Sequence, residues 1–176
     1  MTQGISRRGV LTSAGILGGL ALVPTLTRYA SAAEPTEVPQ TVPRRPVTKE
    51  AFEAEFVDAT ILFPYELPAD SPFPTSAPEG GQESWLSGDG EATAYIWWLV
   101  AVERAVVGAA DRGDDESRSY WLNVASQWPL TEARVLAVAD PQNSWATQVF
   151  QPVEEQGNLS PMRSHIEDAA ARAYRP

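Results

Sequence analysis

The second half of the chain repeats its apolar residues every three or four positions, which predicts amphipathic helices rather than strands. The clearest apolar stripe has the spacing of one helix face: Trp121, Val124, Ala125 and Trp128. It predicts a helix over 115–127 that Asp114 caps and Pro129 closes. A helix over 90–110 is apolar almost all round, so we expect neighbours to bury it on several sides. Its uninterrupted apolar run of 11 residues, 92–102, is too short to span a membrane.

Shorter helices are predicted on either side of this buried helix. Thr48 is a good N-cap for a first helix over 48–59, and Asp89 is placed to cap the buried helix. The pattern over 131–139 predicts another short helix. Alternation of apolar and polar residues never extends far enough to predict a strand. We therefore expect an all-α fold, a small bundle of about five to six helices.

Proline follows a capping residue at two further positions, Asp140-Pro141 and Ser160-Pro161. This order is typical of a helix start, with proline in the first turn. It predicts one helix after residue 140 and a last helix after residue 160. Pro152 is expected to kink or end the first of these two helices.

A proline-rich segment over 60–84 interrupts the helical pattern. Its prolines exclude both a continuous helix and a central strand, so we expect an extended arm that its aromatic rings anchor on the helices. Long irregular segments within compact domains are often functional. The candidate binding arm consists of four aromatic residues: Phe63, Tyr65, Phe73 and Trp85.

The N-terminal part of the chain has a different composition from the helical part. Residues 33–46 are rich in proline and poor in apolar side chains, which predicts a disordered spacer. A single helical domain is expected over 47–176, long enough to enclose a core.

The sequence Ser6-Arg7-Arg8-Gly9-Val10-Leu11 stands directly before a mildly apolar stretch over 10–26. It resembles the twin-arginine (Tat) export signal, with Thr12 where lysine is frequent. Small residues at Ala30 and Ala32 match the cleavage pattern of signal peptides. An uncleaved anchor is the alternative, but Pro24 and several glycines make this stretch a poor spanning helix.

This resemblance implies that residues 1–32 form a signal peptide, that cleavage follows Ala32, and that the export machinery is a partner. The domain would then fold in the cytoplasm and work outside it, secreted or extracytoplasmic, with no stable membrane anchor after cleavage. The region from Gly90 to Trp128 is also loosely similar to small exported actinobacterial proteins of uncharacterised function. That similarity implies no catalytic residues.

Charge and composition exclude several classes of function. Removal of residues 1–32 takes away three arginines and no acids, which leaves 10 basic and 23 acidic residues and a net charge of −13. Such an acidic surface repels nucleic acids and anionic lipids. The chain has no cysteine and one histidine, so disulfides, thiol chemistry and the usual zinc sites are excluded. We predict no cofactor and no metal.

Glu103 is the most unusual charged residue, because it lies within the most apolar predicted helix. A carboxylate there needs a partner or a raised pKa. We expect a structural ion pair with Arg134 or Arg163. A hydrolase that uses carboxylates alone, centred on Glu103, is the alternative, and it needs a second acid nearby.

The remaining candidate groups have simpler interpretations. His165 is expected at the surface or its boundary, since the neighbouring Ser164 points in a different direction and no triad forms. The acidic cluster at 111–116 lacks the spacing of a calcium loop, and capping by Asp114 explains it.

Three hypotheses for function follow. The first is a non-catalytic domain that binds an unidentified protein partner or a small ligand. The others are the Glu103 hydrolase and a sugar-binding module that uses exposed tryptophans such as Trp85.

Overall fold

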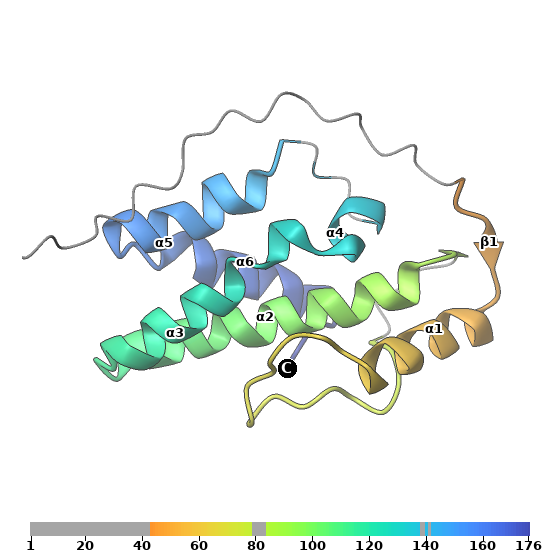
Figure 1. The fold of residues 1–176 in the computed structure, drawn as a ribbon, viewed down its shortest axis with the longest axis horizontal. Coiled ribbons are helices and arrows are strands. Elements are labelled where there is room, and N and C mark those ends of the chain that lie inside the picture. Colours follow the sequence, from red (N-terminus) through yellow and green to blue (C-terminus); the bar gives the residue numbers. More distant parts are fainter. Residues whose placement is uncertain (1–42, 79–83, 138–139, 141) are drawn as a thin grey trace, which may run out of the picture. The chain divides into compact units, whose positions relative to one another are not determined.

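A computed structural model describes residues 43–78, 84–137, 140 and 142–176 of the chain. The predicted signal motif and cleavage site lie outside these residues. The described part is a helical bundle, which confirms the all-α prediction (Figure 1). Its α-helices are α1 (Lys49–Ile61), α2 (Asp89–Asp111), α3 (Asp115–Ala125), α4 (Glu132–Ala137), α5 (Gln151–Gln156) and α6 (Ser160–Ala171). A 3-10 helix, Trp128–Leu130, and a π-helix, Ala146–Phe150, add one turn each.

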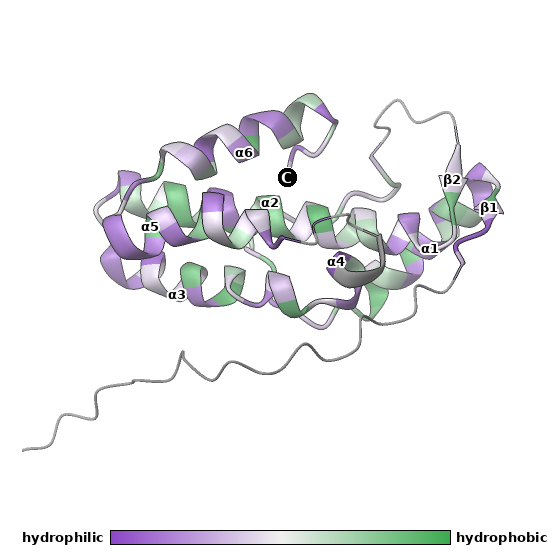
Figure 2. Cartoon of the chain, turned by 90° about the horizontal axis from the view of Figure 1, so that it is seen from above, coloured by the Kyte–Doolittle hydropathy of each residue, from purple (hydrophilic) through white to green (hydrophobic). Residues whose placement is uncertain are grey.

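Helix α2 forms the centre of the bundle and contacts α1, α3, α4 and α6. It runs between α6 and α3 (Figure 2), and most of its residues are buried. Among helices of the described residues, α2 alone is long and apolar enough to cross a membrane, by length and composition. However, 78% of its most apolar stretch is buried inside the protein, as the sequence predicted for a helix covered on several sides.

A close approach of α1 and α2 requires glycine at position 90. A β-carbon on Gly90 would lie 2.2 Å from the carbonyl oxygen of Phe52 and 2.7 Å from the backbone nitrogen of Phe56. Since both are backbone atoms, no side-chain rotation would relieve the clash. The absence of a side chain at this position therefore sets how closely the two helices pack.

The start of α2 differs from the prediction that Asp89 caps it. Gly88 occupies the N-cap position with φ of 86°, a left-handed conformation that glycine adopts without strain. The capping carboxylate comes from α1 instead, because Glu55 Oε2 accepts hydrogen bonds from the backbone nitrogens of Gly88 (2.9 Å) and Gly90 (3.3 Å). Asp89 accepts from the backbone nitrogen of Leu86 at 2.6 Å.

Two very short strands, which the sequence did not predict, join the start of the described chain to the segment before α2. Strand β1 (Pro46–Val47) pairs antiparallel with β2 (Trp85–Leu86). Arg44 donates to the carbonyl oxygen of Ser87 and forms an ion pair with Asp89. Residues 44–46, assigned to the spacer by composition, are thus in contact with the domain. Strands of two residues are too short to give a periodic signal.

The proline-rich arm after α1 packs its rings onto α2. Phe63 and Tyr65 lie against Trp98, at ring-centroid distances of 5.9 and 4.9 Å, and Phe63 also meets Phe73 at 5.0 Å. The indole nitrogen of Trp98 donates to the carbonyl oxygen of Glu66 at 2.8 Å. These contacts agree with the expected extended arm that aromatic rings anchor. The rings of the arm are partly buried and pack against the core.

The predictions for α1 and α3 are confirmed at their N-termini, where Thr48 and Asp114 accept hydrogen bonds as N-caps. The predictions for the last two helices need correction. Ser160 is the first residue of α6, not its cap, and Leu159 occupies the cap position. Pro152 does not end the helical segment, because it lies in the first turn of α5, which directly follows the π-helix and runs to Gln156.

Candidate functional site

A cavity of about 700 Å³ lies beside α2, between the segment that leads into the π-helix and α6. Its apolar wall is formed by Pro78, Ile96, Leu99, Trp128, Trp145, Val149 and Ala169. Its polar wall is formed by Asp140, Ser144, Gln148, His165, Asp168, Arg172 and Tyr174. This size and mixture are typical of sites for small organic ligands.

Glu103 lies behind this cavity and is fully buried, with an exposed fraction of 0%. Both of its carboxylate oxygens have partners: Oε1 accepts from the indole nitrogen of Trp145 at 2.7 Å, and Oε2 lies 2.8 Å from Nδ1 of His165. A buried carboxylate without such partners would carry a large desolvation penalty. The tertiary fold therefore brings three residues from α2, the π-helix segment and α6 into one polar group within an apolar wall.

The expected ion pair of Glu103 with Arg134 or Arg163 is wrong. Arg134 donates to the carbonyl oxygen of Asp140 at 2.6 Å, and Arg163 lies 2.5 Å from the carboxylate of Asp111. Arg134 is thus paired with Asp140, and Arg163 with Asp111. An imidazole and an indole, which sequence reasoning did not consider, stabilise Glu103 instead.

Comparison of the chain with known protein families, curated proteins and solved structures found no match.

His165 links the buried carboxylate to the cavity. Its side chain is 33% exposed, so its expected position at the surface boundary is confirmed. Burial lowers the pKa of His165, but the hydrogen bond to Glu103 and the charges of Glu103 and Asp168 raise it, and Arg172 lowers it again. The net effect is a raised pKa, because the contact with Glu103 favours the imidazolium.

The second ring nitrogen of His165, Nε2, lies on the opposite edge of the ring from Glu103. Within the described residues, no hydrogen-bond partner is found for Nε2. His165 lines the cavity, and its Nδ1 is occupied by Glu103, so Nε2 is the ring nitrogen that a cavity ligand would contact. The geometry therefore leaves this nitrogen free to contact a ligand.

Asp140 and Ser144 hold the opposite edge of the cavity in place. Asp140 Oδ1 accepts from both the backbone nitrogen and the hydroxyl of Ser144, at 2.7 and 2.6 Å. Burial raises the pKa of Asp140. The hydrogen bonds from Ser144 and Trp145 and the charge of Arg134 lower it by more, so the net effect is a depressed pKa. The Ser144 hydroxyl is consequently engaged as a donor.

The other predicted site residues lie elsewhere. The rings of Phe63, Tyr65 and Phe73 are partly buried and pack against the core, and none of the three lines the cavity. Trp85 is half-buried and stacks on Phe52 at 5.8 Å. Neither arrangement presents a free aromatic platform.

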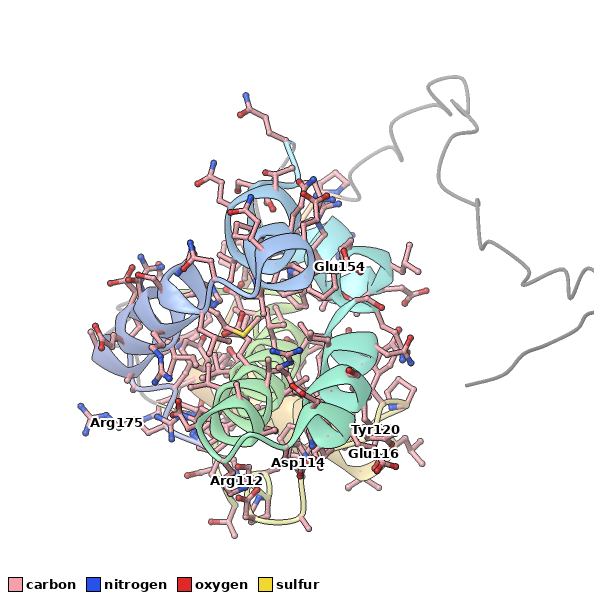
Figure 3. All side chains as sticks on the ribbon, turned by 90° about the vertical axis from the view of Figure 1, so that its left-hand side faces the viewer. Arg112, Asp114, Glu116, Tyr120, Glu154 and Arg175 are labelled. Atoms are coloured by element: carbon pink, nitrogen blue, oxygen red, sulfur yellow. The ribbon has the colours of Figure 1, made fainter. Side chains whose placement is uncertain are left out.

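The acidic cluster between α2 and α3 has a structural role. Figure 3 shows Asp114 and Glu116 at this turn, and the side chain of Asp114 caps α3 through the backbone nitrogen of Ser117. Among the described residues, no group of three or more acidic or histidine side chains is placed to hold a metal ion.

Sequence reasoning missed His165 as a site residue, although a signal was present. On α6 it lies three residues after Met162 and four before Ala169, both of which are buried. This spacing places His165 on the apolar face of α6. A single histidine on that face and a single acid on the apolar helix form a complementary pair that a search for buried polar residues would find.

Proposed function

We propose that this protein is an exported, extracytoplasmic domain that binds a small organic ligand in the cavity between α2 and α6. The observation that carries this proposal is the Glu103–His165 pair at the cavity wall. A buried ion pair contributes little stability compared with apolar residues of the same volume. A histidine whose pKa is raised by a buried carboxylate at a cavity wall is therefore a candidate for function.

The charges around the cavity indicate which ligands fit. Asp140 is balanced by Arg134, which lies 3.9 Å away, and Glu103 is balanced by His165 when the imidazole is protonated. The cavity wall adds Asp168 and Arg172, of opposite charge. Since these charges cancel, the cavity favours an uncharged or zwitterionic molecule with an apolar body, which the two tryptophans of the wall would contact.

Filling the cavity tests this proposal. Ala169 lines the cavity and is 7% exposed, whereas Ala171 on the same helix is exposed. Nile red, an uncharged apolar dye, should bind the protein with increased fluorescence. Ala169→Phe should weaken that binding at least tenfold, and the matched control Ala171→Phe should leave it unchanged. Equal binding by both variants, with unchanged circular dichroism, would refute a ligand site at this cavity.

The proposed export rests on the motif residues Ser6, Arg7, Arg8 and Leu11. Replacement of Arg7 and Arg8 by lysine preserves charge and removes the guanidinium pair that defines the motif. The double variant should remain in the cells, while the control Arg28→Lys should be exported like the wild type. Immunoblots of culture fluid and cell lysate measure both. Normal export of the double variant would exclude the twin-arginine route.

A further inference from the structure

The geometry points to a proton-transfer site in this cavity, in which His165 Nε2 takes a proton from water and the resulting hydroxide attacks a small carboxylic ester. This inference rests on the proposed function, because the ester must first occupy the cavity. It differs from the predicted carboxylate-only hydrolase in one respect. The group that touches the substrate is the imidazole, while Glu103 is a positioning residue.

Glu103 fixes both the position and the tautomer of the imidazole. Its Oε2 is 2.8 Å from Nδ1 of His165, and a carboxylate can only accept, so Nδ1 carries the hydrogen. In the neutral ring, Nε2 then bears the lone pair and acts as the base. The hydrogen bond from Trp145 to Oε1 holds the carboxylate itself in place at 2.7 Å. Because Glu103 is 0% exposed, it cannot contact a substrate directly.

Water is the nucleophile that the site supplies. The only serine hydroxyl among the cavity residues, that of Ser144, donates to Asp140 at 2.6 Å and is thus committed to another partner. A water molecule next to Nε2 meets no such competition. Transfer of its proton to the imidazole gives an imidazolium, which the adjacent Glu103 carboxylate stabilises.

The reaction balances with water as the only co-reactant. The water oxygen forms a bond to the acyl carbon while its proton moves to Nε2, which gives a tetrahedral intermediate. Arg172 and Gln148 line the same cavity and carry donors for the oxyanion. The bond from carbon to the leaving oxygen then breaks, and Nε2 returns its proton to that oxygen. The products are a carboxylic acid and an alcohol, and the imidazole regains its neutral form.

An ester matches the surroundings of this histidine. The charges at the cavity cancel when His165 is protonated, so an uncharged substrate with an apolar body suits the wall of Trp128, Trp145 and Leu99. A base must be neutral, and when His165 is neutral the charged groups in and around the cavity carry one excess negative charge. Glu103, Asp140 and Asp168 are negative, whereas Arg134 and Arg172 are positive. An anionic ester would be repelled in that state.

Hydrolysis of p-nitrophenyl acetate, followed by release of p-nitrophenolate, tests the inference. His165 is the only histidine in the chain, so any rate that depends on an imidazole belongs to it. The wild type should hydrolyse the ester with a rate that rises along a single sigmoid, with its midpoint above pH 6.5. His165→Ala should lower this rate about 100-fold, and added imidazole should restore part of it.

Glu103→Gln tests the positioning role. A glutamine amide can donate to Nδ1, which would place the hydrogen on Nε2 and remove the base. The rate should fall at least tenfold, with loss of the sigmoid. The matched control is Glu154→Gln, because Glu154 is exposed on α5 (Figure 3). If Glu103→Gln fails to fold, the pH profile and the imidazole rescue still decide the matter.

Failure of this inference is distinguishable from failure of the proposed function. Binding of Nile red that Ala169→Phe abolishes, together with a hydrolysis rate equal to the buffer rate, would overturn the esterase and leave the ligand site standing. An esterase rate that His165→Ala does not change would also overturn the inference. Loss of both activities in Ala169→Phe, with imidazole rescue of His165→Ala, would support both proposals.

Discussion

Replacement of Gly90 by alanine tests the packing of α1 on α2. The added β-carbon would lie 2.2 Å from the carbonyl oxygen of Phe52 and 2.6 Å from the β-carbon of Glu55, so α1 must move away. Overpacking of this kind costs about 1–3 kcal/mol, and contact with a backbone atom places the change at the upper end. Alanine gains about 1 kcal/mol over glycine in a helix. The expected net loss of unfolding free energy is about 2 kcal/mol.

Gly108 on the same helix supplies a matched control. A β-carbon there would meet only the end of the Arg112 side chain, at 3.3 Å, which can rotate away. Gly108→Ala should therefore stabilise the protein by about 0.5–1 kcal/mol. Urea unfolding, followed by circular dichroism at 222 nm and by tryptophan fluorescence, measures both variants. If Gly90→Ala is as stable as Gly108→Ala, the close approach of the two helices is not as described.

Three further predictions concern stability. The raised pKa of His165 means that the folded protein binds the imidazolium proton more tightly than the unfolded chain. The resulting stabilisation is fully present below about pH 6.5 and is lost as the pH rises through the raised pKa. Urea unfolding of the wild type at pH 6 and 8.5 should show this difference in stability, and His165→Asn should remove it. Trp98→Phe leaves the carbonyl oxygen of Glu66 without its donor, so it should lower the unfolding free energy by about 1–3 kcal/mol beyond the effect of the smaller ring. Trp97→Phe removes an indole nitrogen that is buried without a partner, so in the same assay it should lower the unfolding free energy less. Thr48→Ala removes the N-cap of α1 and should lower the unfolding free energy by about 1 kcal/mol, and an unchanged denaturation midpoint would contradict the capping role.

The helices could be predicted from the sequence because their signals are local. The stripe that ends at Trp128 and the caps Thr48 and Asp114 depend on neighbours three or four residues away, and the structure confirms each of them. The apolar character of α2 likewise predicted a central helix. Local patterns of this kind survive because tertiary packing agrees with them.

The errors arose where distant residues decide the structure. Glu55, more than 30 residues away along the chain, caps α2, and no local pattern indicates this contact. The π-helix before Pro152 packs against α6, and no local pattern indicates this contact. The partners of Glu103 are separated from it by 42 and 62 residues. A carboxylate in an apolar helix predicts that a partner exists, but only the fold identifies it.

The length and apolar character of α2 have a consequence for the proposed export of this chain. A channel that threads an unfolded polypeptide would present Asp89–Asp111 to the lipid before its covering helices had passed through. The segment would then be free to move sideways into the bilayer and halt transit. Passage of the finished bundle avoids this, because α1, α3, α4 and α6 already shield the segment from the hydrocarbon.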